Sequence, residues 1–592
     1  MQYRNKHQWQ DMALMVAIGS VVPGCLILNG CSGASHLFLS NSRESHRARA
    51  KVTIVWPERK STRLIPVASN ALKVTIQGIN GFTVTQVISR PVTAAVFTNL
   101  PPGALTIIAT AHADTFGAVE PAQAYGAQVV NALPDEQFQL GLTLGSTIDR
   151  VELTTAKATL DIGTTVTCAV TAKNAAGLVV LTNASTWSWS TVNGAVATVI
   201  GTGLTAVVTG VAAGTTGVVV RENESTKSVT SQITIVDPLA GVKEYLNIDL
   251  NAVPNYAAPN YPVHYDNVVL AQDNTPGNNR VSDKGALLGR VLFYDQRLSF
   301  NDTVSCASCH APTNGFVDNA RFSRGYEGGF TTAHAMRLGN IRFYAGRSMF
   351  WDKRSTSVEN QSTQPIQNDI EMGFHGGQGG LQALLTKLAA SSYYPELFKW
   401  AYGDASITEL RIQNALSQFE RSMVSLNSAF DTGFASVFNV AQPGAGIGNR
   451  FANYTAQEER GKVLFTTAPN QGGAGCVTCH TVPTFALDAN SRSNGLDAGE
   501  TVVFKSPSLK NVGLTGPYMH DGRFATLSAV VAHYNSGVQN GPALDNRLKT
   551  PQGTPLRLNL QQGDQDALVA FLKTLNDPIL SNDQKFLNPF KK

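Results

Sequence analysis

Two copies of one short motif could do chemistry: two cysteines separated by two residues and followed directly by a histidine. One copy, Cys-Ala-Ser-Cys-His, spans residues 306–310, and the other, Cys-Val-Thr-Cys-His, spans residues 476–480. In c-type haem attachment this pattern supplies two thiols that form thioethers with the haem and an imidazole that binds the iron. The sequence therefore predicts two covalently bound haem c groups, held by Cys306, Cys309, His310, Cys476, Cys479 and His480.

Two other uses of these cysteines fit the sequence less well. A zinc site needs four ligands that converge on one ion, whereas these pairs are separated by a whole subdomain. A single redox-active Cys-x-x-Cys could precede a histidine by chance, but here the motif occurs twice. A similar segment also precedes each copy, Gly-Arg-Val-Leu-Phe at 289–293 and Gly-Lys-Val-Leu-Phe at 461–465. This internal repeat predicts two haem subdomains.

Composition and charge limit the remaining possibilities. The chain has 592 residues, of which 43% are hydrophobic and only 15% are charged. At about 150 residues per domain this length predicts roughly four structural units, and the composition argues against a disordered chain. The 46 Lys and Arg residues nearly balance the 42 Asp and Glu residues, which leaves a net charge of +4. So small a charge over this length argues against a nucleic-acid partner.

The chain ahead of the haem motifs is predicted to form two β modules. Residues 50–148 alternate apolar and polar side chains and are interrupted by turn residues, which predicts a β-sandwich. Residues 149–237 repeat this style and resemble bacterial immunoglobulin-like (group 2) domains. Here Cys168 alternates with Val166 and Val170, so we expect a buried structural thiol. Neither module clusters His, Cys or carboxylates, and we interpret both as spacer or docking units.

After Asp237, in the part of the chain that carries the haem motifs, apolar residues recur at the spacing of a helix. We expect this part to be mainly α. Following the internal repeat, we divide it into a first haem subdomain at residues 275–440 and a second at residues 450–585. The predicted fold is therefore multidomain, with two N-terminal β-sandwich modules followed by a mainly α di-haem domain.

Two long helices are predicted within this part. Apolar residues recur at steps of three and four from Ile412 to Phe430, which predicts one long amphipathic helix. Ser406 and Glu409 form a capping-box pattern ahead of it. Near the C-terminus Asp564 is predicted to cap a further helix. The apolar face of that helix comprises Leu568, Phe571, Leu572 and Leu575.

Residues 1–31 have the order of an export signal. Basic residues precede an apolar run from about residue 12 to residue 28, and small residues follow. The sequence Leu-Asn-Gly-Cys that ends at Cys31 resembles a lipoprotein processing box, although its asparagine departs from the usual small residue. An ordinary cleaved signal and an uncleaved anchor are the alternatives. Each of the three places the rest of the chain in the periplasm or cell envelope, with membrane contact only through this segment.

Further motifs accompany the two haem motifs in a fixed order. They are Phe-Trp-Asp-Lys-Arg at 350–354, Pro-Ile-Gln-Asn-Asp-Ile-Glu-Met at 365–372, Pro-Ser-Leu-Lys-Asn-Val at 507–512 and Pro-Tyr-Met-His-Asp-Gly-Arg at 517–523. With these motifs, about residues 275 to 580 resemble the bacterial di-haem cytochrome c peroxidase and MauG family. The resemblance implies a peroxidatic first haem and an electron-transfer second haem.

The resemblance also implies roles for individual residues. Glu371 would stand over the open face of the first haem, with Gln367 beside it as an orienting donor and Pro365 in the pocket wall. A carboxyl in an apolar pocket has a raised pKa and suits proton transfer during peroxide cleavage. Trp351 would lie between the haems and carry electrons. Without the resemblance, Glu371 could equally cap a helix or be solvated, and Trp351 could be a core residue.

The sequence departs from the family pattern near the first haem. Some family members close the resting site with a histidine on a Gly-His-Gly loop, whereas the corresponding residues 324–328 contain no histidine. His334 is nearby and is a displaced gate, a structural histidine or a changed metal-site residue. The resemblance also implies a calcium ion bound by the backbone carbonyls of Thr515 and Pro517. His334 in place of the family's asparagine weakens this expectation.

A second departure concerns the second haem. Tyr534 takes the place of the methionine that peroxidases carry as the distal ligand, and MauG has a tyrosine there. An anionic oxygen ligand stabilises ferric iron, so this haem would be a poorer electron acceptor. Met519 and His533 are rival ligands, and Tyr534 could also be a core residue.

These inferences predict a di-haem c-type peroxidase that reduces hydrogen peroxide to water. A small cytochrome c or cupredoxin would supply the electrons. One alternative is a MauG-like enzyme that uses peroxide to oxidise a protein or peptide side chain. The other is a non-catalytic di-haem electron carrier, which would have no use for a proton-transferring carboxyl.

Overall fold

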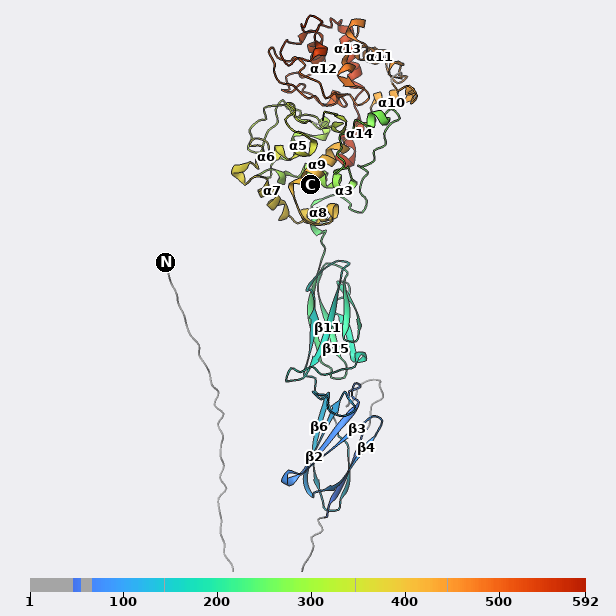
Figure 1. Ribbon diagram of the computed structural model, residues 1–592, viewed down its shortest axis with the longest axis vertical. Coiled ribbons are helices and arrows are strands. Elements are labelled where there is room, and N and C mark those ends of the chain that lie inside the picture. The colour runs from blue at the N-terminus through green and yellow to red at the C-terminus, as the bar shows by residue number, and fades with distance from the viewer. Residues whose placement is uncertain (1–45, 55–65, 143, 347, 444–445, 592) are drawn as a thin grey trace, which may run out of the picture.

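The computed structural model describes residues 46–54, 66–142, 144–346, 348–443 and 446–591. The predicted export signal and Cys31 lie outside these residues. Figure 1 shows two β modules arranged end to end, followed by the helical part that ends the chain. Within the described residues, none of the helices combines the length and the apolar character needed to cross a membrane.

The first β module consists of two sheets around one apolar core. The three-stranded sheet contains β4 (Ala94–Leu100), β1 (Ala48–Thr53) and β7 (Gln137–Leu140) in that order. The five-stranded sheet contains β3 (Thr83–Ser89), β2 (Ala71–Gln77), β5 (Gly103–His112), β6 (Ala124–Ala132) and β8 (Gly145–Ser146). Alternate residues of β5, such as Leu105 and Ile107, are fully buried, as expected when only one face of a strand meets the core.

The second β module consists of two sheets as well, each with four strands. One contains β13 (Ala197–Thr202), β14 (Thr205–Gly210), β11 (Thr165–Lys173) and β9 (Arg150–Thr155). The other contains β10 (Thr159–Asp161), β16 (Ser228–Val236), β15 (Gly214–Glu222) and β12 (Trp187–Thr191). Cys168 is completely buried together with Val166 and Val170. The expectation that this thiol is structural agrees with its position in the core.

Hydrogen bonds between described residues join the β modules to each other. The Gln123 side chain donates to the Leu181 carbonyl at 2.6 Å, and the Val67 amide donates to the Glu224 carboxylate at 2.8 Å. Short helix α1 (Ala240–Tyr245) then begins the helical part. The prediction of a β-rich N-terminal half followed by a mainly helical half is confirmed.

The helical part is built around two equivalent helix crossings. Helix α3 (Asp283–Tyr294) packs on α9 (Glu409–Ser422), and α11 (Ala456–Thr466) packs on α13 (Gln562–Lys573). The repeated glycine makes both crossings close. A Cβ atom on Gly289 would lie 1.9 Å from the Ala415 carbonyl oxygen, and one on Gly461 would lie 1.9 Å from that of Ala567. The internal repeat of the sequence is therefore a repeat of helix packing.

Shorter elements connect these crossings and hold the haem motifs. In the first subdomain they are α2 (Asn267–Leu270), α4 (Cys306–Cys309), α5 (Val358–Ser362), α6 (Gln364–Gln367), α7 (Gly380–Ala389) and α8 (Tyr394–Tyr402). In the second they are the short strands β17 (His480–Thr481) and β18 (Ala486–Leu487), and α12 (Leu527–Ala532). Helix α10 (Ala429–Val437) falls within the residues predicted for the first subdomain, but its Phe430 and Phe434 lie in the core of the second.

The prediction of one long helix from Ile412 to Phe430 is wrong. Helix α9 ends at Ser422 and α10 begins at Ala429, although the apolar residues of both are buried. Side chains from distant segments bind the backbone amides of the break: Asp577 accepts from Leu426 and Asn427 at 2.8 and 3.0 Å. Tertiary hydrogen bonds thus replace the helical ones at this point.

Two predicted helix caps are also displaced. Helix α9 is capped by Thr408, whose hydroxyl accepts from the Arg411 amide, and not by Ser406. Asp564 lies in the first turn of α13, after the N-cap Gln561, and its carboxylate pairs with Arg460 at 2.8 Å. An acidic side chain is favourable in either position at a helix N-terminus, so sequence alone did not separate them. The predicted apolar face of α13 is buried.

The end of the chain returns to the first subdomain. After α14 (Pro578–Asn582), Leu580 and Phe586 join the core that surrounds α3. The Phe586 carbonyl accepts a hydrogen bond from Tyr294 at 2.6 Å. The last residues of the predicted second subdomain thus pack against the first, and they tie the two halves of the helical part together.

Candidate functional site

The first haem motif lies on the single turn α4, which packs against α3. The next residue, His310, has Nδ1 3.1 Å from the Phe316 carbonyl oxygen. Since a carbonyl only accepts, Nδ1 carries the proton and Nε2 keeps its lone pair, as a metal-binding imidazole requires. Burial lowers the pKa of His310, which keeps the ring neutral. Phe316 reaches back to it by adopting a left-handed backbone with φ of 64°.

The second motif has a similar backbone arrangement, but His480 Nδ1 is buried without a hydrogen-bond partner among the described residues. Residues 476–478 form a single helical turn, and the loop after His480 contains Phe485 with φ of 52°. Burial, reinforced by the positive charge of Arg337, lowers the pKa of His480 to about 4. Both predicted proximal ligands are therefore neutral imidazoles at physiological pH.

The four motif cysteines are free thiols, and the structure does not pair them in disulfides. Burial raises the pKa of Cys309 to about 11 and that of Cys476 to about 12, and it also raises the pKa of Cys306 and Cys479. A redox-active Cys-x-x-Cys has the opposite property, a lowered pKa. The raised pKa values therefore argue against a role in disulfide exchange.

A cavity of about 390 Å³ opens beside the second motif. Cys476, Cys479 and His480 line one side of it, and Leu527, Val531, Leu568 and Leu572 are among its apolar walls. The cations Arg337 and Lys505 also line it, and no carboxylate of the described residues pairs with either. Thiols, a neutral imidazole, apolar walls and unpaired cations fit haem c, because its ring is apolar and its propionates are anionic.

Two of the three proposed distal ligands line this cavity. Tyr534 lies on a π-helical turn, His533–Gly537, that continues α12. The Asn494 side-chain amide lies 3.4 Å from the Tyr534 hydroxyl and 3.3 Å from the Met519 sulfur. His533 is not among the lining residues, and its Nε2 lies 3.2 Å from the Asn494 carbonyl. The geometry favours Tyr534 and Met519 over His533. Burial raises the pKa of Tyr534 to about 12.

Glu371 lines a separate pocket of about 580 Å³ in the first subdomain. The Asn368 side chain fixes its backbone by accepting from the Ile370 and Glu371 amides at 2.9 and 3.0 Å. Burial raises the pKa of Glu371, and the opposite charge of Arg354 in the same pocket works against this shift. The Glu371 carboxylate in turn raises the pKa of Cys306. The proposed proton-transferring group therefore lies in electrostatic reach of the first haem motif.

The structure places both other residues that were predicted near Glu371 at the same pocket. Pro365 and Gln367 line the same pocket, but Gln367 is exposed and its amide donates to the Thr363 carbonyl at 3.2 Å. The structure gives Gln367 no hydrogen bond to Glu371. The loop 324–328, where a gating histidine was considered, packs on this segment: a Cβ on Gly325 would lie 1.6 Å from the Ile370 carbonyl oxygen.

Trp351 and its neighbour Phe350 line different pockets. Trp351 lines the second-motif cavity, while Phe350 lines the Glu371 pocket. The Trp351 indole donates to the His334 carbonyl at 2.7 Å and lies edge-on to His520, with ring centroids 6.4 Å apart. This position suits electron transfer between the pockets.

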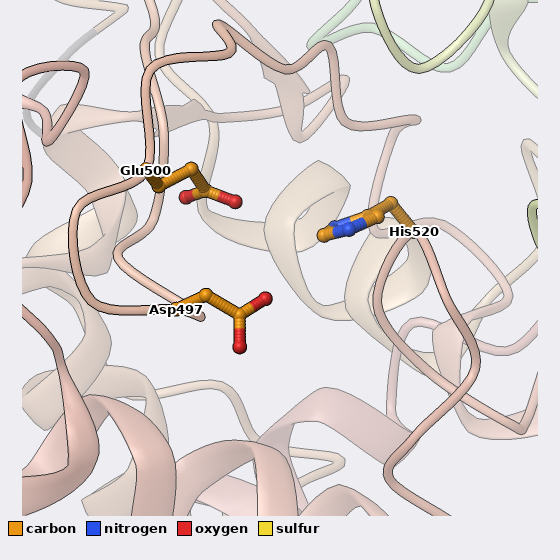
Figure 2. A group of neighbouring side chains, drawn as sticks. All are labelled: Asp497, Glu500 and His520. Carbon is orange, nitrogen blue, oxygen red and sulfur yellow. The ribbon is translucent and has the colours of Figure 1, made fainter.

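His520 continues the aromatic contacts beyond Trp351. Its ring stacks on Phe504 at 4.2 Å. Figure 2 shows His520 opposite the carboxyl groups of Asp497 and Glu500, and ligand atoms of the three lie within 4.8 Å of one another. Asp497 also pairs with Arg523 at 2.8 Å, so a cation already neutralises it. The motif at 517–523 could have drawn attention to His520, but its aromatic partner lies outside that motif.

The predicted calcium ligands lie near Arg337. Thr515 is buried, and its hydroxyl accepts from the Arg337 guanidinium at 3.0 Å. Pro517 lines the same cavity. His334 is buried with Nδ1 3.1 Å from the Ala320 carbonyl, and it lines the second-motif cavity and not the Glu371 pocket.

Comparison with known proteins agrees with this geometry. Residues 283–436 match the family model described as di-haem cytochrome c peroxidase. The methylamine utilization protein MauG of Methylophilus methylotrophus is 30% identical over 315 residues, which are 51% of this chain and 85% of that protein. Cytochrome c551 peroxidase of Nitrosomonas europaea is 29% identical over 319 residues, 51% of this chain and 81% of that protein. The crystal structure of a MauG-like protein associated with microbial copper homeostasis is 27% identical, with a TM-score of 0.45, covering 57% of this chain and 99% of that one.

Proposed function

Since the chain belongs to the di-haem cytochrome c peroxidase and MauG family, we propose that it reduces hydrogen peroxide to water. The electrons come from a small cytochrome c or cupredoxin, and the two cofactors are haem c groups bound by the motifs at 306–310 and 476–480. The reaction takes place in the periplasm or cell envelope. Membrane contact, if the chain has a lipid anchor at Cys31, is confined to the N-terminal segment.

The observation that carries this proposal is the position of Glu371. It is a partly buried carboxyl with a raised pKa, in a pocket of its own and in electrostatic reach of the first motif. The haem held by His310 would supply the iron that binds and reduces peroxide. Glu371 accepts the proton of the oxygen that stays and donates it to the oxygen that leaves as water. Pro365 walls the pocket, and Gln367 lines it.

Trp351 is the proposed electron relay. Its indole is fixed by the hydrogen bond to the His334 carbonyl, and its backbone carbonyl accepts from the Lys505 amide at 2.7 Å. Both contacts hold the ring at the wall of the second cavity. Electrons that enter at the second haem can thus pass through Trp351 toward the Glu371 pocket.

A MauG-like oxidation of a protein or peptide side chain is the second candidate. It is favoured by Tyr534 at the second cavity and by the loop 324–328, which has no histidine to close the first site. In this reading peroxide is still reduced, but the electrons come from the side chain of a macromolecular substrate.

A steady-state assay with reduced small cytochrome c tests the first candidate. Peroxide-dependent oxidation by the di-haem protein is expected, and the Glu371→Gln variant should lose about 10²- to 10⁴-fold in rate, because an amide cannot take the proton. Glu396→Gln on the surface of α8 removes a carboxylate from the same subdomain and should leave the rate unchanged. Absence of oxidation by the wild type would leave the MauG-like reaction as the better account.

A further inference from the structure

Two positive side chains face the second-motif cavity without an anionic partner. Lys505 is only 2% exposed, and its ammonium contacts the Met336 sulfur at 3.2 Å and lies 4.9 Å from the centre of the Tyr344 ring. The Arg337 guanidinium donates to the Thr515 hydroxyl at 3.0 Å and to the carbonyls of Ser508 and Pro507. Neither forms an ion pair with a carboxylate of the described residues.

Buried charges without a counter-ion are unfavourable, and proteins usually pair them. Here the Lys505 ammonium and the Arg337 guanidinium both line the cavity, and their hydrogen bonds go to a sulfur, a hydroxyl and backbone carbonyls. The two cations also repel each other. This part of the cavity therefore calls for an anionic occupant, and the propionate carboxylates of haem c are such anions.

The same residues argue against the calcium ion that the family resemblance implies. Calcium takes six to eight oxygen ligands, with carboxylates prominent among them. At this place the Arg337 guanidinium lies against Thr515, since it donates to the Thr515 hydroxyl at 3.0 Å, so a positive charge already stands beside the residue whose backbone carbonyl would bind calcium. His334 directs Nδ1 to the Ala320 and Arg321 carbonyls at 3.1 and 3.2 Å. Among the described residues, the group of His, Cys, Asp or Glu side chains close enough to share an ion is Asp497, Glu500 and His520, and it contains none of these.

The positive charges of Arg337 and Lys505 also argue against a calcium ion here. Arg337 lines the same cavity as His480, and its guanidinium donates to the Thr515 hydroxyl at 3.0 Å. A divalent cation placed beside a guanidinium and an ammonium would be repelled. The residues present fit haem c but do not fit calcium.

We propose that Arg337 is a built-in cation that takes the place of calcium at this boundary. With Lys505 it neutralises the carboxylates of the second haem, so the protein needs no divalent ion to set the reduction potential of that haem. Arg337 and Lys505 are cofactor-positioning residues, and they take no part in proton transfer. The inference rests on the proposed di-haem function, but it concerns the second haem alone.

The test begins with the wild-type holoprotein. Its calcium content is measured by elemental analysis, and the midpoint potential of the second haem is measured by spectroelectrochemical titration before and after treatment with EDTA. We expect calcium well below one ion per chain and an unchanged potential. One calcium per chain whose removal shifts the potential, with recovery when calcium is added back, would overturn the proposal.

Substitutions then test the role of the charge. Arg337→Gln should reduce the equilibrium constant for reduction of the second haem by about tenfold, which is 59 mV for a one-electron couple. Arg337→Lys should restore most of it. Arg460→Gln removes an exposed guanidinium that pairs with Asp564 in the same subdomain, and it should leave the potential unchanged. Equal potentials in Arg337→Gln and wild type would contradict the proposal.

Two further measurements keep the result interpretable. If Arg337→Gln does not fold, Lys505→Met removes the other charge at similar volume and should shift the potential in the same direction. Failure of the proposed function is visible separately: it would appear as a haem content below two per chain or as absence of peroxide turnover. The calcium content and the potential of the second haem do not depend on turnover.

Discussion

At the scale of single residues, the account depends on groups whose ionisation is opposed by their surroundings. Glu371 is partly buried with a raised pKa, His480 is held neutral, and Tyr534 is held protonated in the absence of iron. These shifts come from burial first and from neighbouring charges second. Shifted pKa values of this kind cluster at functional sites, and here they gather around both predicted haem positions.

The pH dependence of peroxide reduction should follow Glu371. To accept a proton the carboxyl must be ionised, and burial raises its pKa above the ordinary 4.5. The kcat/KM for peroxide should therefore fall as the pH falls through this raised pKa, and it should level off at higher pH. Stopped-flow measurement of the reaction with peroxide at a series of pH values checks this. An acidic limb that persists in Glu371→Gln would assign the titration to another group.

The distal ligand of the second haem can be tested by exchange. Tyr534→Met should raise the reduction potential of the second haem, because a neutral thioether favours ferrous iron relative to an anionic oxygen. Met519→Leu should leave the potential unchanged if Tyr534 is the ligand. A redox titration followed in the visible spectrum decides between them, and the opposite pattern of shifts would assign the ligand role to Met519.

The residues proposed to bind haem covalently and those in the family motifs could be predicted from sequence, because a local pattern specifies them. The sequence did not predict Arg337 and Lys505 as partners of the second cavity. Their significance comes from missing ion pairs, which only the folded structure reveals. Gln367 was predicted to orient Glu371. In the structure its side-chain amide donates a hydrogen bond to the Thr363 carbonyl at the start of the same helix.

At the scale of elements, two close helix crossings position both motifs. Because the repeated glycines have no side chain, the backbone of α3 packs directly against that of α9, and the backbone of α11 packs directly against that of α13. Periodicity in the sequence predicted which faces are buried, but it missed the break between α9 and α10. Asp577 stabilises that break from a distant segment, so no local signal marks it.

Gly461→Ala should destabilise the second subdomain. The new Cβ would lie 1.9 Å from the Ala567 carbonyl oxygen, so the helices must separate, at a cost of about 1–3 kcal/mol. Gly563→Ala in α13 is the matched control, because a Cβ there meets nothing within 4 Å. Differential scanning calorimetry should show a lower Tm for the first variant and an equal or higher Tm for the second. Equal stability of both variants would mean that the crossing is not tight.

At the scale of the whole molecule, every proposed site residue lies in the helical part. The β modules carry a buried thiol at Cys168, and hydrogen bonds from Gln123 and Val67 join the two modules. The sequence predicted this division from a change in periodicity. It did not predict that Leu580 and Phe586 return to the first core, because packing between segments so far apart in the chain leaves no periodic signal.

A chain that begins at Pro238 should therefore retain the chemistry. We expect it to bind two haems and to reduce peroxide with an unchanged kcat, because the cores that hold the motifs lie after this residue. Haem content from the pyridine haemochrome spectrum and the steady-state assay check this. A loss of haem content would show that the β modules support the fold of the haem subdomains.

The most direct test of the central claim is the electron paramagnetic resonance spectrum of the resting diferric protein with and without cyanide. The account predicts one open haem at the Glu371 pocket and one haem closed by a side chain of the second cavity. One high-spin signal should thus appear beside a low-spin signal, and cyanide should convert the high-spin signal to low-spin. Two low-spin signals that cyanide leaves unchanged would contradict the account and indicate an electron carrier.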